Sequence, residues 1–318
     1  KGSYRDGRHD HQAEAGKNLT TTIDMDLQKY GEKLMKNKIG SIVAIEPETG
    51  EILALVSSPT YDPGLLVGRP RSKNFKKLDS DTLNPLFNRA LMARYPPGST
   101  FKVVNALIGK QEDVLYNSTT YECHGGFRSG NFFMGCHNHP SPQDLIGSIK
   151  VSCNTYYANV FKQILQDSEF NNVSSAFTNW KKYLESFGFG TKMNIDLVNE
   201  APGFLPSVNY YNKYYGENQW GYLTVISLAI GQGELGITPL QMANMTSIIA
   251  NRGFYYTPHV VKNIEGEEQI PSRFREQNET MIDSSIFRPV IEGMDLAVNG
   301  EPGTGSTART AAIKDITV

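Results

Sequence analysis

The chain has 318 residues, of which 39% are hydrophobic, enough to bury the core of one large domain or of two modest ones. Its formal net charge is −2, with 31 basic and 33 acidic residues, so the overall charge gives no support for a nucleic-acid partner. The sequence contains no apolar run long enough to span a bilayer and no signal-peptide pattern.

Residues 1–17 are polar and charged. This composition is typical of a linker, of the tail of a preceding N-terminal domain, or of an added extension. We interpret them as such a remnant and expect a single domain over residues 18–318.

The first predicted elements of this domain are a short strand at 20–23 and a helix that begins after Asp24. The side chains of Leu27, Tyr30 and Leu34 share one face of that helix, which is expected to end near Gly40.

Two apolar runs at 41–45 and 52–56 flank a turn that contains Pro47 and Gly50, a pattern that predicts a β-hairpin. Residues 59–86 lack periodicity and are expected to form a long surface loop. The remaining expectations are helices at 100–111, 144–151, 155–165, 174–187 and 238–251, strands at 192–197, 255–262 and 311–318, and an irregular region at 114–142.

The segment Tyr95-Pro-Pro-Gly-Ser-Thr-Phe-Lys102 combines a stiff turn with the start of a predicted helix. Ser99 and Lys102 are three residues apart and therefore share a face of that helix. A lysine whose pKa is lowered by burial or by nearby positive charge can take the proton of a serine hydroxyl and activate it as a nucleophile. Taken alone, the pattern also fits an N-cap serine followed by an exposed lysine.

Ser152 and Asn154 lie between two predicted helices, about fifty residues after Ser99. A hydroxyl and an amide on one turn can hydrogen-bond both a lysine ammonium and a substrate amide, and they can equally cap a helix–helix turn. The combination of Ser-x-x-Lys with a later Ser-x-Asn resembles the active-site pattern of the penicillin-recognising serine acyl-transferases.

The resemblance extends over nearly the whole chain and is closest to class B penicillin-binding proteins of the elongation type. It implies the mixed α/β fold of serine β-lactamases and transpeptidases, in which an antiparallel sheet lies between helical layers and a helical subdomain carries Ser152. The segments that carry the resemblance are 19–28, 45–57, 88–90, 95–102, Ile230-Gly-Gln-Gly233 and 238–243.

This family membership would make the protein a peptidoglycan D,D-transpeptidase of cell-wall elongation. Ser99 would attack the penultimate D-Ala carbonyl of a stem peptide ending in D-Ala-D-Ala and release the terminal D-Ala. Lys102 would accept the serine proton, Ser152 would relay a proton to the leaving amine, and Asn154 would bind the substrate amide. The N–H of Ser99 would supply one oxyanion donor, and β-lactams would acylate Ser99.

The resemblance also implies a cellular setting. The native protein would be anchored in the bacterial inner membrane through an N-terminal segment and would act on its periplasmic face. A glycan polymerase of the elongation machinery would be its partner.

One departure from the family is evident. The third family motif, Lys-Thr-Gly or Lys-Ser-Gly, is missing, because Thr304-Gly305 has no lysine before it. Residues 311–318 resemble the segment that leads into the strand carrying that motif, so we expect a transpeptidase domain that is incomplete at its C-terminus and inactive by itself. Two other uses of Ser99 stay open: a D,D-carboxypeptidase or β-lactamase that passes the acyl group to water, and a non-catalytic penicillin-binding sensor or scaffold.

All three cysteines fall in one stretch of about thirty residues that also holds three histidines. Such a set can form a closed structural Cys3His zinc site, while a disulfide between Cys123 and Cys136, or free thiols, are the alternatives. Some elongation-type penicillin-binding proteins hold zinc here, and matching their positions implies the ligands Cys123, Cys136, His139 and Cys153, with His137 as a substitute for His139. The acyl transfer itself requires no cofactor.

Overall fold

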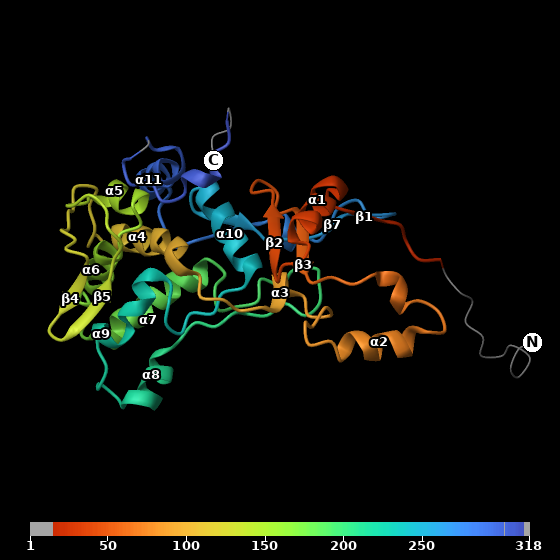
Figure 1. Cartoon of the computed structure of the whole chain (residues 1–318), viewed down its shortest axis with the longest axis horizontal. Helices are drawn as coiled ribbons and strands as arrows, with labels where there is room; N and C mark the ends of the chain where they lie inside the picture. The colour runs from red at the N-terminus through yellow and green to blue at the C-terminus, as the bar shows by residue number, and fades with distance from the viewer. Residues whose placement is uncertain (1–14, 302, 315–318) are drawn as a thin grey trace, which may run out of the picture.

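The computed structural model describes residues 15–301 and 303–314 (Figure 1). Its strands are β1 (Leu19–Thr21), β2 (Gly40–Ile45), β3 (Ile52–Ser58), β4 (Gly126–Ser129), β5 (Phe132–Gly135), β6 (Phe254–Tyr256), β7 (Val261–Ile264) and β8 (Gln277–Glu279). Its α-helices are α1 (Met25–Met35), α2 (Arg71–Asp79), α3 (Arg89–Met92), α4 (Lys102–Gln111), α5 (Leu145–Lys150), α6 (Asn154–Leu165), α7 (Val173–Ser186), α8 (Val208–Tyr215), α9 (Tyr222–Val225), α10 (Pro239–Ala250) and α11 (Phe287–Asn299).

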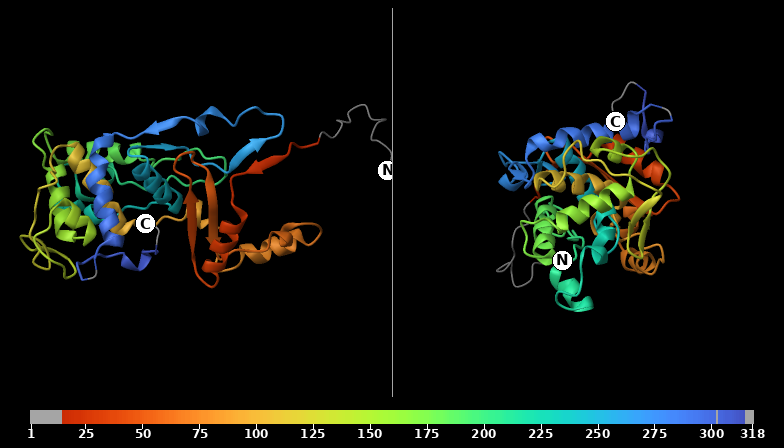
Figure 2. Two further views of the ribbon diagram at one scale, coloured as in Figure 1. Left: turned by 90° about the horizontal axis from the view of Figure 1, so that it is seen from above. Right: turned by 90° about the vertical axis from the view of Figure 1, so that its left-hand side faces the viewer.

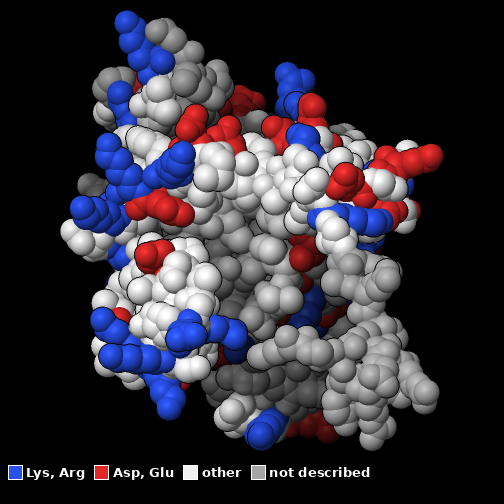
Figure 3. All heavy atoms as spheres, turned by 90° about the vertical axis from the view of Figure 1, so that its right-hand side faces the viewer, with Lys and Arg blue, Asp and Glu red and all other residues white. Residues whose placement is uncertain are grey.

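The molecule is elongated. A helical lobe built around α4 and α6 occupies one end, the β2–β3 hairpin with α1 lies toward the other, and α2 projects beside the hairpin (Figures 1 and 2). Basic and acidic side chains both occur across the face that looks out from the hairpin end (Figure 3). Within the described residues, no helix has the length and apolar character needed to cross a membrane.

The named strands of the described chain pair antiparallel, in four two-stranded sheets. The β2–β3 pair is the predicted hairpin, with Val43 opposite Leu55 and Ala44 opposite Ala54. Helix α1 contacts β3 and helix α10 contacts β2, so helices flank the hairpin on both sides. This arrangement confirms the mixed α/β class expected from the sequence.

Helix α1 begins where the sequence predicts, because the Asp24 side chain accepts hydrogen bonds from the N–H groups of Asp26 and Leu27. The apolar face of this helix is turned outward. Leu27, Tyr30 and Leu34 are 39%, 58% and 44% exposed, and the helix instead meets β3 through Gly31. A Cβ at Gly31 would lie 2.9 Å from Val56 Cγ2, so the missing side chain lets the helix approach the strand closely.

The core of the helical lobe surrounds α4, in which eight consecutive residues, Lys102 to Gly109, are buried. The largest buried side chain, Trp180 of α7, packs edge-on against Phe161 of α6. Helix α4 is therefore a rigid central element. It fixes the position of Lys102 at its start and of the Gly98–Phe101 turn that precedes it.

The local signals at helix ends predict the other helices well. Asp144 caps α5, and Thr238 with Gln241 forms a capping box around Pro239 at the first turn of α10. The expected helices at 144–151, 155–165, 174–187 and 238–251 are confirmed, with ends within a residue or two.

Four regions differ from expectation. The strand expected at 255–262 is split into β6 and β7, which pair with β8 and β1 in separate sheets. Residues 192–197 form no strand, because the N–H groups of Met193, Asn194 and Ile195 bond to the Glu200 carboxylate instead of a neighbouring strand. The region 59–86 contains α2, whose sequence is too polar to show helical periodicity. The irregular region 114–142 contains the β4–β5 hairpin, and of the expected strand 311–318 the last four residues lie outside the described part, while Arg309–Ala311 is a 3-10 turn.

Candidate active site

Ser99 lies in a 3-10 turn, Gly98–Phe101, which continues directly into α4. The Thr100 hydroxyl donates to the Pro97 carbonyl at 2.8 Å and thereby closes the turn over the two prolines. Ser99 is exposed, and its hydroxyl makes no hydrogen bond to the described residues. The predicted nucleophile is thus held at the start of a buried helix with its hydroxyl accessible.

The structure brings Lys102, Ser152 and Asn154 into direct contact, although the two motifs are 50 residues apart. The Lys102 Nζ donates to the Ser152 carbonyl at 2.7 Å, to Ser152 Oγ at 3.0 Å and to Asn154 Oδ1 at 2.6 Å. Lys102 is only 2% exposed, so the reading of an exposed surface lysine is wrong.

Burial lowers the pKa of Lys102 from its ordinary 10.5 to about 8, while the negative charge available on Cys136 and Cys153 acts in the opposite direction. The Tyr157 ring also lies below the ammonium, with its centroid 5.9 Å from Nζ. A lysine in this state can lose its proton near neutral pH, which is what activation of a serine hydroxyl requires.

Ser152 joins α5 to α6 in a left-handed conformation with φ of 53°, which is uncommon for a serine. Its N–H donates to the Ile149 carbonyl at 3.0 Å, which fixes the turn. The Asn154 Nδ2 donates to the Gly135 carbonyl at 2.8 Å, so the Asn154 Oδ1 is directed toward Lys102. Backbone strain of this kind concentrates at functional sites.

Ser99 and Ser152 line one cavity of about 270 Å³. Val103 of α4, Ile149 of α5 and Met294 of α11 provide apolar walls. The cavity thus places the exposed hydroxyl of Ser99 and the Ser152 turn around one space in which a substrate group can react.

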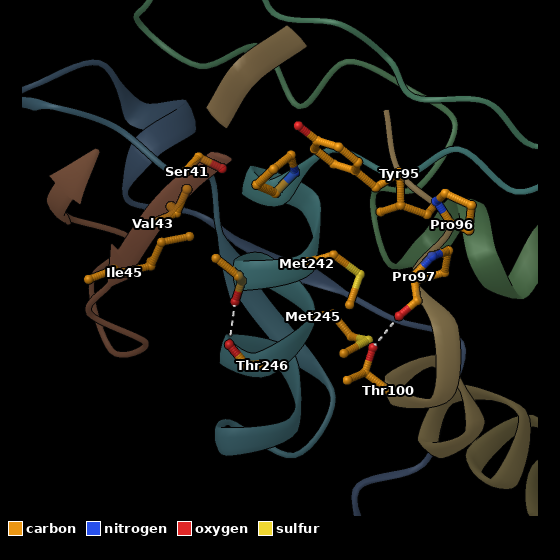
Figure 4. A pocket seen from close by; sticks show the side chains of 14 residues that line it. Ser41, Val43, Ile45, Tyr95, Pro96, Pro97, Thr100, Met242, Met245 and Thr246 are labelled. Carbon is orange, nitrogen blue, oxygen red and sulfur yellow. Dashed lines mark hydrogen bonds between the residues drawn. The ribbon is translucent and has the colours of Figure 1, made fainter. Parts of the chain in front are cut away.

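A second, larger groove of about 690 Å³ adjoins this site (Figure 4). Val43 and Ile45 of β2 form one wall, Met242 and Met245 of α10 form the floor, and Thr100, beside Ser99, lies at its other side (Figure 4). Thr100 and Met245 line both the groove and the smaller cavity, so the two spaces meet at the Ser99 turn.

Cys123, Cys136, His139 and Cys153 come together as the sequence indicates, with their three sulfur atoms and a ring nitrogen within 4.8 Å of one another. All three thiols are free, so the structure does not contain the alternative Cys123–Cys136 disulfide. His137 lies outside this group, with its ring centroid 5.3 Å from that of His139.

The chemistry of the four donors fits a zinc ion. The His139 Nδ1 donates to the Pro140 carbonyl at 2.7 Å, which leaves Nε2 with its lone pair facing Cys136 Sγ at 3.4 Å. Hydrogen bonds from the Cys153 thiol and from the Asn154 N–H lower the pKa of Cys136, and the Tyr156 N–H points at Cys153 Sγ at 3.3 Å. A thiolate stabilised in this way at Cys136 is a ligand that structural zinc prefers.

Sequence reasoning missed three groups that complete the site: the Gly135 carbonyl, the Tyr157 ring and Thr155, whose Oγ1 lies 3.1 Å from Cys123 Sγ. Thr155 and Tyr157 follow Asn154 closely on α6, and this closeness in the sequence was the signal that could have identified them. The Gly135 carbonyl offered no such signal, because any residue of a hairpin can supply a backbone acceptor.

Comparisons with known proteins agree with this geometry. Residues 40–318 match the family model of the penicillin binding protein transpeptidase domain. The chain is 32% identical to the peptidoglycan D,D-transpeptidase MrdA of Haemophilus influenzae over 93% of its length, and 30% identical to MrdA of Escherichia coli K12 over 81%. It covers only 44% and 40% of these relatives, so it spans less than half of their length.

Solved structures give the same result. The chain superposes on Pseudomonas aeruginosa PBP2, in a complex with WCK 5153, with a TM-score of 0.79 at 30% identity, covering 93% of this chain and 66% of that one. It also superposes on Helicobacter pylori PBP2 with a TM-score of 0.77 at 27% identity, covering 94% of this chain and 53% of that one. The chain therefore belongs to the penicillin-binding protein transpeptidase family, and its relatives are of the PBP2 type.

Proposed function

We propose that this chain is the catalytic part of a peptidoglycan D,D-transpeptidase of cell-wall elongation that cross-links stem peptides through an acyl-enzyme on Ser99. One observation carries the proposal. The buried Lys102, with its pKa lowered to about 8, is held by Ser152 and Asn154 beside an exposed serine on the same helical turn. The names of the relatives support the same reaction.

The proposed reaction follows from this arrangement. Neutral Lys102 takes the proton of the Ser99 hydroxyl as Oγ attacks the penultimate D-Ala carbonyl, and a tetrahedral intermediate forms. The proton then passes through Ser152 Oγ, 3.0 Å from Lys102 Nζ, to the amine of the departing D-Ala. An amine of a second stem peptide resolves the ester on Ser99 and restores the hydroxyl.

Asn154 has a double role in this proposal. Its Oδ1 holds Lys102 and one N–H of its Nδ2 holds the Gly135 carbonyl. An amide nitrogen carries two hydrogens, so one donor remains for the backbone carbonyl of a stem peptide.

The Ser99 N–H, at the start of a helix, would donate to the oxyanion. The second donor in this family belongs to the strand with the Lys-Thr-Gly or Lys-Ser-Gly motif, which the sequence does not contain. We propose that this strand occupies the groove between β2 and α10, which meets the Ser99 turn at Thr100. Without this strand, the chain by itself would react slowly or not at all.

Cys123, Cys136, His139 and Cys153 would bind one structural zinc ion. When bound, the ion would supply four bonds that tie the loop of β4 and β5 to the start of α6, with no position left for water. Cys153 lies between Ser152 and Asn154, so the site would stabilise the turn that holds Lys102.

The proposed setting is the periplasmic face of the bacterial inner membrane, with an N-terminal anchor outside the present sequence. Residues 1–17 would then be the remnant of a preceding domain. Helicobacter pylori PBP2 has been solved in a complex with MreC, and a peptidoglycan synthase complex is another structural neighbour. We infer that a glycan polymerase is the partner here too.

Intact mass spectrometry with benzylpenicillin tests the function. A one-equivalent adduct on the Ser99 peptide that persists for hours supports a transpeptidase, whereas rapid loss of the adduct indicates a hydrolase. A complete-length protein that forms no adduct would refute the assignment of Ser99. Native spectra would show one additional zinc mass if the metal proposal holds, and none if the thiols are merely free.

A further inference from the structure

The segment Ile226–Gly231 runs beside the first turns of α4 and contacts them at two places. Before Ser99, the Gly98 N–H donates to the Gly231 carbonyl at 2.8 Å. After Lys102, the Asn105 Nδ2 donates to the carbonyls of Leu228 at 3.2 Å and Ala229 at 3.0 Å. One segment thus holds the backbone on both sides of the nucleophile and the base, and we refer to residues 226–231 as the brace.

Gly231 permits this close approach. Its φ of 67° lies in the left-handed region, and a Cβ there would be 2.2 Å from the Gly98 carbonyl oxygen and 2.7 Å from Phe101 Cβ. Neither atom can swing aside, because one is backbone and the other is fixed to the backbone. Even a methyl group at position 231 would therefore have to displace the peptide that connects Gly98 to Ser99.

Asn105 makes the second contact rigid. Its side chain is fully buried on α4, three residues after Lys102, and its Oδ1 accepts from Trp180 Nε1 at 2.9 Å. With the acceptor engaged by α7 and the donors engaged by the brace, the amide has one orientation. A leucine of similar size would leave the carbonyls of Leu228 and Ala229 without this donor.

We propose that Gly231 and Asn105 are positioning residues for the acylation of Ser99. Neither touches the reacting atoms. They act through the Gly98–Ser99 peptide and through α4, so that Ser99 and Lys102 keep one relative geometry. The inference rests on the proposed acyl-enzyme function and assigns a role to Gly231 within the Ile230-Gly-Gln-Gly233 segment, but none to Gly233.

The first test is Gly231→Ala in the full-length protein, with Gly233→Ala as the matched control. Gly233 also has a left-handed φ, of 73°, and its Cβ would crowd Ser227 Oγ at 2.5 Å, but nothing in the Ser99 turn. Because a displacement of about 1 Å can cost about 100-fold in rate, we expect Gly231→Ala to lower the rate constant of Ser99 acylation by benzylpenicillin about 10- to 100-fold. Gly233→Ala should change it less than about 3-fold at a comparable loss of melting temperature. Equal effects of the two variants on acylation would overturn the proposal.

A second pair of variants covers the case in which Gly231→Ala does not fold. Asn105→Leu removes the bonds to the brace together with the bond to Trp180, whereas Trp180→Phe removes the indole bond and part of the buried ring but leaves the bonds to the brace in place. We expect both to lower the melting temperature and only Asn105→Leu to slow acylation by about 10-fold or more. Acylation of the Asn105→Leu variant at the wild-type rate would contradict the role of Asn105.

A measurement that needs no activity separates this inference from the proposed function. Amide hydrogen exchange at Gly98, followed by NMR, should accelerate in Gly231→Ala and stay unchanged in Gly233→Ala, because only the first breaks the bond from Gly98. If wild-type Ser99 is never acylated, the proposed function fails. The exchange data would still test whether the brace holds the Gly98 N–H. Unchanged protection of Gly98 in folded Gly231→Ala would refute it.

Discussion

The environment of Lys102 predicts the pH dependence of Ser99 acylation. Its pKa falls from 10.5 to about 8 because the ammonium is buried. This difference corresponds to about 3 kcal/mol in favour of the neutral amine. Neutral Lys102 then makes up about a tenth of the protein at pH 7 and about nine tenths at pH 9, so the acylation rate should rise about tenfold between these values and level off above.

Stopped-flow acylation by a fluorescent penicillin between pH 6 and 10 measures this profile in the full-length protein, and melting temperatures across the series confirm that it stays folded. A lysine with the ordinary pKa of 10.5 would instead give about a 100-fold rise from pH 7 to 9 without a plateau. That result would refute either the burial of Lys102 or its role as the base.

The same shift predicts the sign of a stability effect. The folded-state pKa of Lys102 lies below that of the unfolded chain, so between about pH 8 and 10.5 the unfolded chain binds more protons. The contribution of Lys102 to the free energy of unfolding therefore increases with pH across this window.

Three further predictions follow from individual contacts. Ser99→Ala should abolish covalent penicillin labelling with the melting temperature within about 1 °C of wild type, since the hydroxyl is exposed; labelling at wild-type yield would exclude Ser99 as the nucleophile. Cys153→Ser should remove bound zinc and make the melting temperature insensitive to chelator, while that of the wild type falls; equal wild-type melting with and without chelator would count against the metal. Trp180→Phe should lower the free energy of unfolding by about 1–3 kcal/mol in urea titrations, because buried Asn105 Oδ1 loses its donor, and an unchanged midpoint would contradict that bond.

Residue-specific local signals made much of the fold predictable. Asp24, Asp144 and Thr238 mark helix starts, and the hairpin of β2 and β3 follows from two apolar runs around a Pro/Gly turn. The site was predictable only through the family resemblance, because the Ser99–Lys102 pair and the Ser152–Asn154 pair each fit an ordinary helix cap when taken alone. Lys102 and Ser152 are 50 residues apart, and no local signal indicates that they meet.

The failures have a different cause, because each depended on a contact that the local sequence pattern does not reveal. The strand expected at 192–197 was lost to the buried carboxylate of Glu200, which takes the backbone N–H groups that a sheet would have used. Helix α1 meets β3 through Gly31 and through the polar side chain of Gln28, whereas its apolar face of Leu27, Tyr30 and Leu34 is turned outward. Hydrophobic periodicity cannot indicate a contact made by a residue without a side chain.

Asn154 links the cysteine cluster to the proposed base. Its N–H donates to Cys136 Sγ at 3.2 Å, while its Oδ1 accepts from Lys102 Nζ at 2.6 Å. Gly135, which orients the Asn154 amide, directly precedes Cys136, and Cys153 directly precedes Asn154. An ion shared by Cys136 and Cys153 would therefore fix the distance between the hairpin and the helix that together direct Oδ1 at Lys102. Loss of the ion should loosen one of the three acceptors of the ammonium, so a metal that takes no part in the chemistry would still influence how well the base is positioned.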